Sequence, residues 1–195
     1  MTQMIIRRAS TEDAAALMKL RIEAEGWLAR AGVDQWRSPG FRDRALAKWQ
    51  EDIAAGRTWV VEGDGKEVLG TVTLARADTD FWKAFDAPET AVYVAKLITA
   101  RQAAGLQLGG RILDWVGSVA RERGLPWVRL DCWRSNLKLQ DYYLREGFRH
   151  VRTEAPEHRL SGWMAQRPAA VRAHPELPPL LVDTNSIVDS PESAS

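Results

Sequence analysis

Three glycines that follow an apolar run are the first residues in this sequence whose types and spacing favour a particular chemistry. The run Thr90–Ala100 is rich in apolar and β-branched residues, Gly105, Gly109 and Gly110 come next, and an amphipathic pattern follows. A strand, a glycine loop and a helix N-terminus form an anion site, because the first N–H groups of a helix lack helical partners. Glycine also lets the backbone approach a phosphate closely. The segment therefore predicts a site for the pyrophosphate of a nucleotide-like cofactor.

A second set of residues that could take part in catalysis lies further along the chain, in the spacing N-x6-Y-x3-GF. It consists of Asn136, Tyr143, Gly147 and Phe148. Asparagine is a common helix N-cap and glycine a common helix stop, so capping is one role for Asn136, as packing is for Tyr143. A tyrosine hydroxyl, with a pKa of about 10, can also act as the acid for a departing thiolate. The ordered spacing of the four residues favours a catalytic or binding role over capping and packing alone.

The elements that would position these residues favour an α+β fold. Apolar residues at helical spacing and at alternating spacing predict helices and strands respectively. We expect helices over 14–31, 41–55, 108–123 and 136–146, and strands over 4–8, 57–62, 66–76, 90–100, 127–133, 148–153 and 158–166. The sequence Gly63-Asp64-Gly65 predicts a hairpin between two of these strands. Hairpins mixed with crossovers indicate a mixed sheet, and a hairpin before the glycine loop argues against a dinucleotide-binding fold.

The composition limits the class of protein. The chain has 195 residues, is 45% hydrophobic and carries a formal net charge of +1, which gives no argument for nucleic acid or a membrane surface as a partner. No apolar run approaches the roughly 18 residues of a membrane span. Cys132 is the single cysteine, and the three histidines lack metal-ligand spacing. We therefore expect a cytoplasmic protein with no metal and no disulfide framework.

The last part of the chain differs from the rest in composition. Five of the nine prolines fall in 168–195, where one arginine stands against four acids. Such a composition predicts a tail over 167–195 that is largely extended or disordered, and a folded domain over 1–166. Within the tail, Leu177–Val182 is apolar enough to dock on the domain.

Taken in order, these residues resemble the GNAT superfamily of N-acetyltransferases over about 4–166. In that family the fourth strand leads into an acetyl-CoA pyrophosphate loop, Q/R-x-x-G-x-G/A, and a later helix carries the Asn, Tyr and Gly-Phe. Here Gly109 matches the last loop position, Gln107 stands where the middle glycine is usual, and Ala104 takes the Q/R position. The resemblance implies a mixed, mostly antiparallel sheet of six to seven strands, flanked by about four helices and splayed between the fourth and fifth strands.

The resemblance also implies a function and a set of roles. It implies transfer of the acetyl group of acetyl-CoA to the amine of a small molecule or a peptide, by direct attack in a ternary complex, with Tyr143 as general acid. The strand would pair with the pantetheine arm, and loop amides would cradle the pyrophosphate. The residues expected to bind the cofactor are Leu97, Ile98, Thr99, Arg101, Gly105, Leu106, Gln107, Leu108, Gly109, Gly110 and Asn136.

The acceptor site and the general base are less defined. Asp131 interrupts an apolar strand, so its carboxylate should face a structural partner or the acceptor amine. Trp36 and Trp82 would border the acceptor side and form a wall for a cationic or flat substrate, unless they simply pack. The candidates for the base are Glu62, Glu89, Tyr93 and Asp131. The sequence leaves open a homodimer, and also a non-catalytic acyl-CoA-binding sensor or scaffold.

Overall fold

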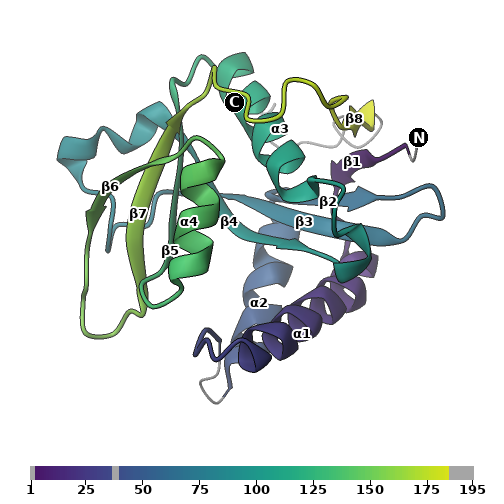
Figure 1. Cartoon of the computed structure of the whole chain (residues 1–195), viewed down its shortest axis with the longest axis horizontal. Helices are drawn as coiled ribbons and strands as arrows, with labels where there is room; N and C mark the ends of the chain where they lie inside the picture. Colours follow the sequence, from purple (N-terminus) through teal and green to yellow (C-terminus); the bar gives the residue numbers. More distant parts are fainter. Residues whose placement is uncertain (1–2, 37–39, 185–195) are drawn as a thin grey trace.

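One open sheet organises the computed structural model, which describes residues 3–36 and 40–184. Eight strands are found in this part of the chain, in the order β6-β7-β5-β4-β3-β2-β1-β8 (Figure 1). Their bounds are β1 Ile5–Arg8, β2 Thr58–Glu62, β3 Val68–Ala75, β4 Ala91–Thr99, β5 Trp127–Trp133, β6 Arg149–Thr153, β7 Ser161–Pro168 and β8 Leu181–Val182. The β4–β5 and β1–β8 pairs are parallel and the other pairs are antiparallel. The expected α+β fold is confirmed, with more strands than the six to seven expected.

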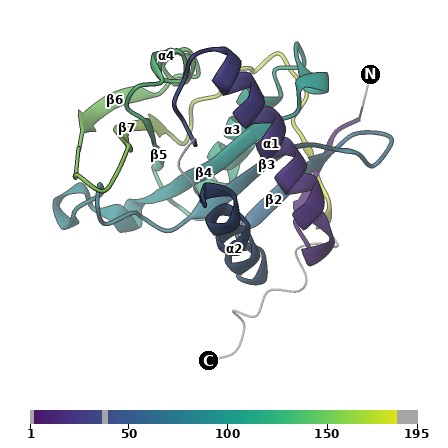
Figure 2. The same cartoon turned by 90° about the horizontal axis from the view of Figure 1, so that it is seen from below.

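Four α-helices of the described residues cover the two faces of the sheet. They are α1 Ala14–Arg30, α2 Phe41–Ala54, α3 Leu108–Glu122 and α4 Leu137–Arg145. The helices α1 and α2 lie on one face and α3 lies on the other (Figures 1 and 2). Ile112 and Val116 of α3 are fully buried in the larger apolar core, whereas Leu17 and Trp49 of α1 and α2 pack with Ile98 in a second core. The α4 helix contacts β5 and β6.

The strands β4 and β5 part halfway along their length. Their parallel pairing runs from Ala91 opposite Trp127 to Val94 opposite Leu130 and ends there. Beyond that point β4 continues to Thr99 with β3 as its neighbour, and β5 continues with β7. The β3–β4 pairing also has an irregular register, and Lys96 of β4 has a φ of 51°. The expected splay between the fourth and fifth strands is therefore confirmed.

The fold continues past the boundary expected at residue 166. The strand β7 runs to Pro168, and Ala169 and Leu180 beyond it are buried in the larger core. The two residues of β8 then pair in parallel with β1. The segment from Ala169 to Val182 thus packs on the domain, and the apolar stretch expected to dock there, Leu177–Val182, contains the buried Leu180 and the strand β8. The remainder of the expected tail, 185–195, lies outside the described residues.

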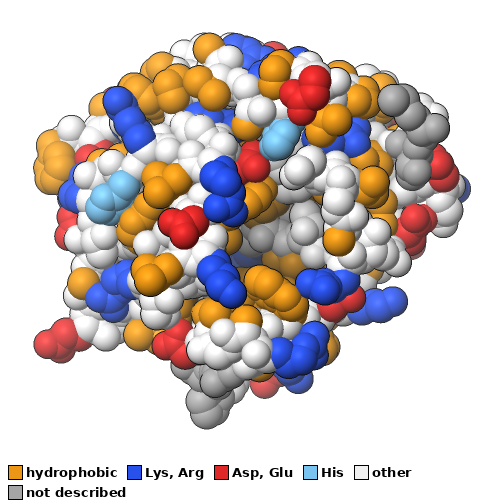
Figure 3. Space-filling view, in the orientation of Figure 1, with side chains coloured by type: hydrophobic (Ala, Val, Ile, Leu, Met, Phe, Trp, Pro, Cys, Tyr) orange, Lys and Arg blue, Asp and Glu red, His pale blue; other side chains and the backbone are white. Residues whose placement is uncertain are grey.

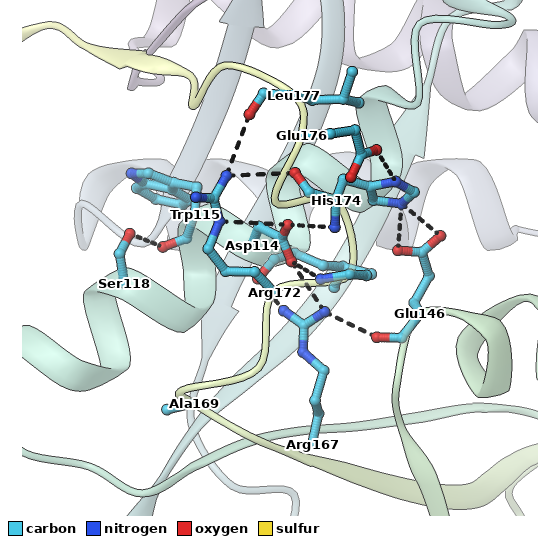
Figure 4. Close-up of polar contacts among 12 residues, drawn as sticks. Asp114, Trp115, Ser118, Glu146, Arg167, Ala169, Arg172, His174, Glu176 and Leu177 are labelled. Atoms are coloured by element: carbon cyan, nitrogen blue, oxygen red, sulfur yellow. Dashed lines mark hydrogen bonds and ion pairs between the residues drawn. The ribbon is translucent and has the colours of Figure 1, made fainter.

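Polar contacts hold this segment against α3 and the end of α4 (Figure 4). The Asp114 carboxylate of α3 accepts hydrogen bonds from the backbone N–H groups of Ala173 and His174, at 2.9 and 3.1 Å. The His174 ring nitrogen Nε2 lies 3.1 Å from Oε2 of the buried Glu146. The guanidinium of the fully buried Arg167 donates to the carbonyl oxygens of Leu113 and Glu146. These contacts fix the position of α3, whose first residue follows the glycine loop.

Candidate active site

A cleft of about 1560 Å³ opens where β4 and β5 part. Figure 3 shows the surface hollowed near the centre of the face seen in Figure 1. Phe41 and Ala45 of α2 line the cleft from one face of the sheet. Tyr142 and Tyr143, which pack with the core under α3, line it as well. The gap between the strands therefore gives both faces of the sheet access to one cavity.

The second half of β4 forms one wall of this cleft. Leu97, Ile98 and Thr99, which we expected to meet the pantetheine arm, all line it. On one side Ile98 pairs with Thr71 of β3, and Thr99 pairs with Gly70. On the other side the described residues supply no strand, because pairing with β5 has already ended. Backbone N–H and C=O groups along this edge are thus available to an extended, amide-containing ligand.

The expected phosphate loop lies at one end of the cleft, on the surface. Arg101 and Gly109 line the cleft, and Gly105 and Leu106 are exposed beside it. Gln107 precedes the first turn of α3 with φ 51° and ψ 31°, a left-handed conformation that favours glycine. The position at which the family pattern has glycine therefore keeps the backbone of a glycine while carrying a glutamine side chain.

Close packing leaves no room for a Cβ atom at two glycines of α3. A Cβ atom on Gly109 would collide with the hydroxyl of Tyr142 on α4. A Cβ atom on Gly110 would collide with the His174 ring and the Glu146 carboxylate. Gly110 and Leu108 are buried and do not line the cleft. Their contribution to an anion site would be the free N–H groups at the start of the helix.

Tyr143 and Asn136 come together at the wall formed by α4. Tyr143 is 6% exposed, lines the cleft, and packs edge-on against Phe148 at 5.7 Å between ring centroids. Burial raises the pKa of its hydroxyl well above the usual value. Asn136 caps α4 by accepting a hydrogen bond from the N–H of Leu139, and its amide donates to Oε1 of Gln35 at 2.8 Å. Asn136 thus lines the cleft while tying α4 to the segment after α1.

Two basic residues of α4 were missed by the sequence analysis. Lys138 and Arg145 line the cleft on the same side as Tyr142 and are exposed. Neither forms an ion pair with any residue of the described part of the chain. Positions 138, 142 and 145 share one face of a helix, and this spacing could have identified Lys138 and Arg145 from the sequence. With Arg101, they give the loop end of the cleft three cationic side chains.

The other end of the cleft contains the expected acceptor residues. Asp131 of β5, Trp36 and Trp82 all line it. Burial and the negative charge of Asp78 raise the pKa of Asp131 to about 6. Trp82 is 2% exposed and packs edge-on against Tyr93, at 5.6 Å between ring centroids. The ring of Trp36 lies under the guanidinium of Arg21, so Trp36 already has a cation as its partner.

The structure separates the four candidates for the general base. Glu62 accepts hydrogen bonds from Arg7 and does not line the cleft, and Glu89 does not line it either. The hydroxyl of Tyr93 donates to the carbonyl oxygen of Pro88, and burial raises its pKa. Asp131 lines the cleft at the point where the strands part. The ion pair of Glu62 with Arg7 joins two strands that are far apart in the sequence, so it could not be predicted from the sequence.

Three further features of the described residues bear on the chemistry. Cys132 is buried in the cleft wall, and burial raises the pKa of its thiol to about 12. Residues 3–36 and 40–184 contain no group of three or more metal-ligating side chains. In the same ranges, no helix has the length and apolar character required to cross a membrane.

Comparisons with known proteins agree with this architecture. Residues 21–148 match the model of the Acetyltransferase (GNAT) family. A protein of Bacillus subtilis described as the uncharacterized N-acetyltransferase YesJ is 26% identical over 152 residues, covering 76% of this chain and 83% of YesJ. A GNAT acetyltransferase structure from Listeria monocytogenes has 23% identity and a TM-score of 0.67, covering 85% of this chain and 94% of its own.

A further solved structure is informative because it holds a ligand. The PaiA N-acetyltransferase of Thermoplasma acidophilum, solved in complex with coenzyme A, has a TM-score of 0.66 at 16% identity. The similarity covers 85% of this chain and 99% of PaiA. It shows a shared fold, and the family match extends over more than half of this chain. The splayed sheet and the ordered motifs agree with that match: this chain belongs to the GNAT family of acetyltransferases.

Proposed function

We propose that this protein is an N-acetyltransferase that moves the acetyl group of acetyl-CoA to a primary amine by direct attack in a ternary complex. The observation that carries the proposal is a cleft through the sheet with Tyr143 on one side and Asp131 on the other. Such a passage lets donor and acceptor meet from opposite faces, which favours direct transfer. The raised pKa of Cys132 argues against an acyl-enzyme, because the thiolate is the nucleophilic form.

The residues of the cleft fit coenzyme A. The open edge of β4 at Leu97–Thr99 suits the amides of the pantetheine arm, and the first N–H groups of α3 suit the pyrophosphate. Arg101, Lys138 and Arg145 supply positive charge at the same end. When bound, acetyl-CoA supplies an activated acyl group as a thioester.

Tyr143 is proposed as the acid that protonates the departing sulfur. Its raised pKa keeps the hydroxyl protonated at neutral pH, so a proton is available for the leaving thiolate. The packing of its ring against Phe148 fixes where the hydroxyl points. General acid assistance of this kind is typically worth about 10²–10⁴ in rate.

Calorimetry with acetyl-CoA and CoA, followed by a panel of amines monitored by thiol release, tests the proposed function. We expect saturable binding and amine-dependent release of free thiol. Absence of binding at high micromolar concentration would refute the proposal. Binding with no turnover across the panel would instead support a non-catalytic acyl-CoA-binding module. That alternative is considered because Gln107 departs from the family pattern.

The variant Tyr143→Phe tests the proposed acid. It removes the hydroxyl and leaves the ring contact with Phe148, so we expect turnover to fall about 10²-fold or more. The dissociation constant of CoA, measured by calorimetry, should stay within about twofold of the wild type. Unchanged turnover would remove Tyr143 from the mechanism.

A further inference from the structure

Asp131 lies at the point where the sheet opens. It follows Leu130, whose pairing with Val94 is the last between β4 and β5. Successive residues of a strand point to opposite faces. Because Cys132 packs in the core with Tyr143, Asp131 points to the other face, on which α1 and α2 lie. The charge of Asp131 still acts on the Tyr143 hydroxyl, so the two groups are within electrostatic reach of each other through the gap.

Asp131 also differs from Asp52 and Asp78, two other acids of the cleft, in its partners. The hydrogen bonds that lower the pKa of Asp131 come from neutral donors, the Ser161 hydroxyl and its own backbone N–H. Each other acid that lines the described cleft is bound to a donor of the backbone or of a basic side chain. These acids are Glu23 with the N–H of Arg101, Asp52 with Arg57 and Lys96, and Asp78 with Arg159. Among the four acids of the described cleft, Asp131 and Glu23 are thus the two that are not bound to a basic side chain.

The cation near Asp131 compensates its negative charge only in part. On its own face the neighbours are Asp78, Arg159 and Ser161, and on the opposite face of the sheet they are Cys132 and Tyr143. Arg159 is the cation of this group, but its guanidinium is already bound to Asp78 at 2.7 Å and to Asp80. A cation that enters the cleft would therefore find a partly desolvated carboxylate with no competing bound base.

Aromatic side chains surround the approach to this carboxylate. Trp133 lies two residues along β5, so it shares the face of Asp131, and its indole nitrogen is held by Asp34 at 3.0 Å. Trp82 and Tyr93 line the same cleft. Rings beside a carboxylate favour an ammonium group attached to an apolar or aromatic body. An acceptor with a negative charge next to its amine would be repelled by Asp131 and Asp78.

Resting on the proposed function, we infer that Asp131 binds the ammonium group of a cationic acceptor and accepts its proton as general base. The ammonium arrives protonated, gives one proton to the Asp131 carboxylate, and the neutral nitrogen attacks the thioester carbon. As the N–C bond forms and the C–S bond breaks, the sulfur takes a proton from Tyr143, which is replaced by the second proton lost from nitrogen. Asp131 then releases its proton to water, so ammonium and thioester give amide, thiol and one proton.

The test compares Asp131→Asn with the wild type, using alkyl ammonium substrates and an aromatic amine that is already neutral at pH 7. We expect kcat/KM for the alkyl amine to fall about 10²-fold, with a smaller loss for the aromatic amine. The ascending limb of the wild-type pH profile near pH 6 should disappear in the variant. The dissociation constant of acetyl-CoA should not change, and Asp131→Glu should restore part of the activity.

Asp141→Asn is the matched control, because Asp141 is exposed on α4 and does not line the cleft. Acetyl transfer by the wild type with equal transfer by Asp131→Asn overturns the inference alone. A wild type that binds no acetyl-CoA and acetylates no amine overturns the proposed function and this inference together. A thermal midpoint at pH 8 that is lower for Asp131→Asn than for the wild type would show a structural carboxylate and would also overturn the inference.

Discussion

The charge of Asp131 links activity to stability at the scale of a single residue. Its pKa is about 6 in the folded protein, above the usual value of 3.8. Between these values the folded state holds a proton that the unfolded state releases, so the free energy of unfolding falls as pH rises through this window. Asp131→Asn should therefore stabilise the protein at pH 8, on the order of 2 kcal/mol, and change little at pH 3.5. Denaturant titrations at the two pH values measure the difference.

Gln107 is a second residue whose conformation has a measurable consequence. Its left-handed backbone is strained for any residue that carries a Cβ atom. Gln107→Gly should raise the free energy of unfolding by about 1 kcal/mol and the melting temperature by about 2–4 °C. Gln107→Ala is the control, since alanine keeps the Cβ atom and should not stabilise. A destabilised glycine variant would mean that the glutamine side chain contributes contacts which outweigh the strain.

At the scale of elements, α4 presents one of its faces to the loop end of the cleft. Lys138 and Arg145 are exposed there and should attract the phosphates of coenzyme A through water. We expect Lys138→Gln and Arg145→Gln each to weaken CoA binding up to about fivefold, with a smaller effect at high salt. Lys66→Gln, on the β2–β3 hairpin, is the control. Calorimetry at two salt concentrations distinguishes a charge effect from a loss of helix stability, which salt would not reduce.

The elements were largely predictable from local pattern, and their long-range partners were not. Apolar periodicity located α3, and Gly63-Asp64-Gly65 located the β2–β3 turn, because both depend on neighbours in sequence. The spacing from Asn136 to Phe148 identified the α4 wall of the cleft. Nothing local shows that Asn136 would bond Gln35, or that Glu62 would be bound by Arg7. The α4 face with Lys138 follows ordinary helical spacing, so it was readable from the sequence.

At the scale of the whole molecule, the segment after β7 completes the core. Its leucine pair gives an internal comparison, since Leu180 is 4% exposed and Leu181 is 45% exposed. Leu180→Ala should lower the free energy of unfolding by about 2–3 kcal/mol, because it removes buried apolar area and leaves a cavity. Leu181→Ala should change it by less than about 0.5 kcal/mol. Equal effects of the two variants in thermal denaturation would show that this segment does not pack as described.

The short strand β8 also affects how molecules of this protein behave toward one another. It pairs with Ile5 and Ile6 of β1, the strand that would otherwise end the sheet on that side. An uncovered edge strand offers free N–H and C=O groups to a neighbouring chain and promotes aggregation. A chain that stops at Pro168 would uncover the apolar edge of β1. We therefore expect two residues far from the cleft to protect this protein against edge-to-edge aggregation.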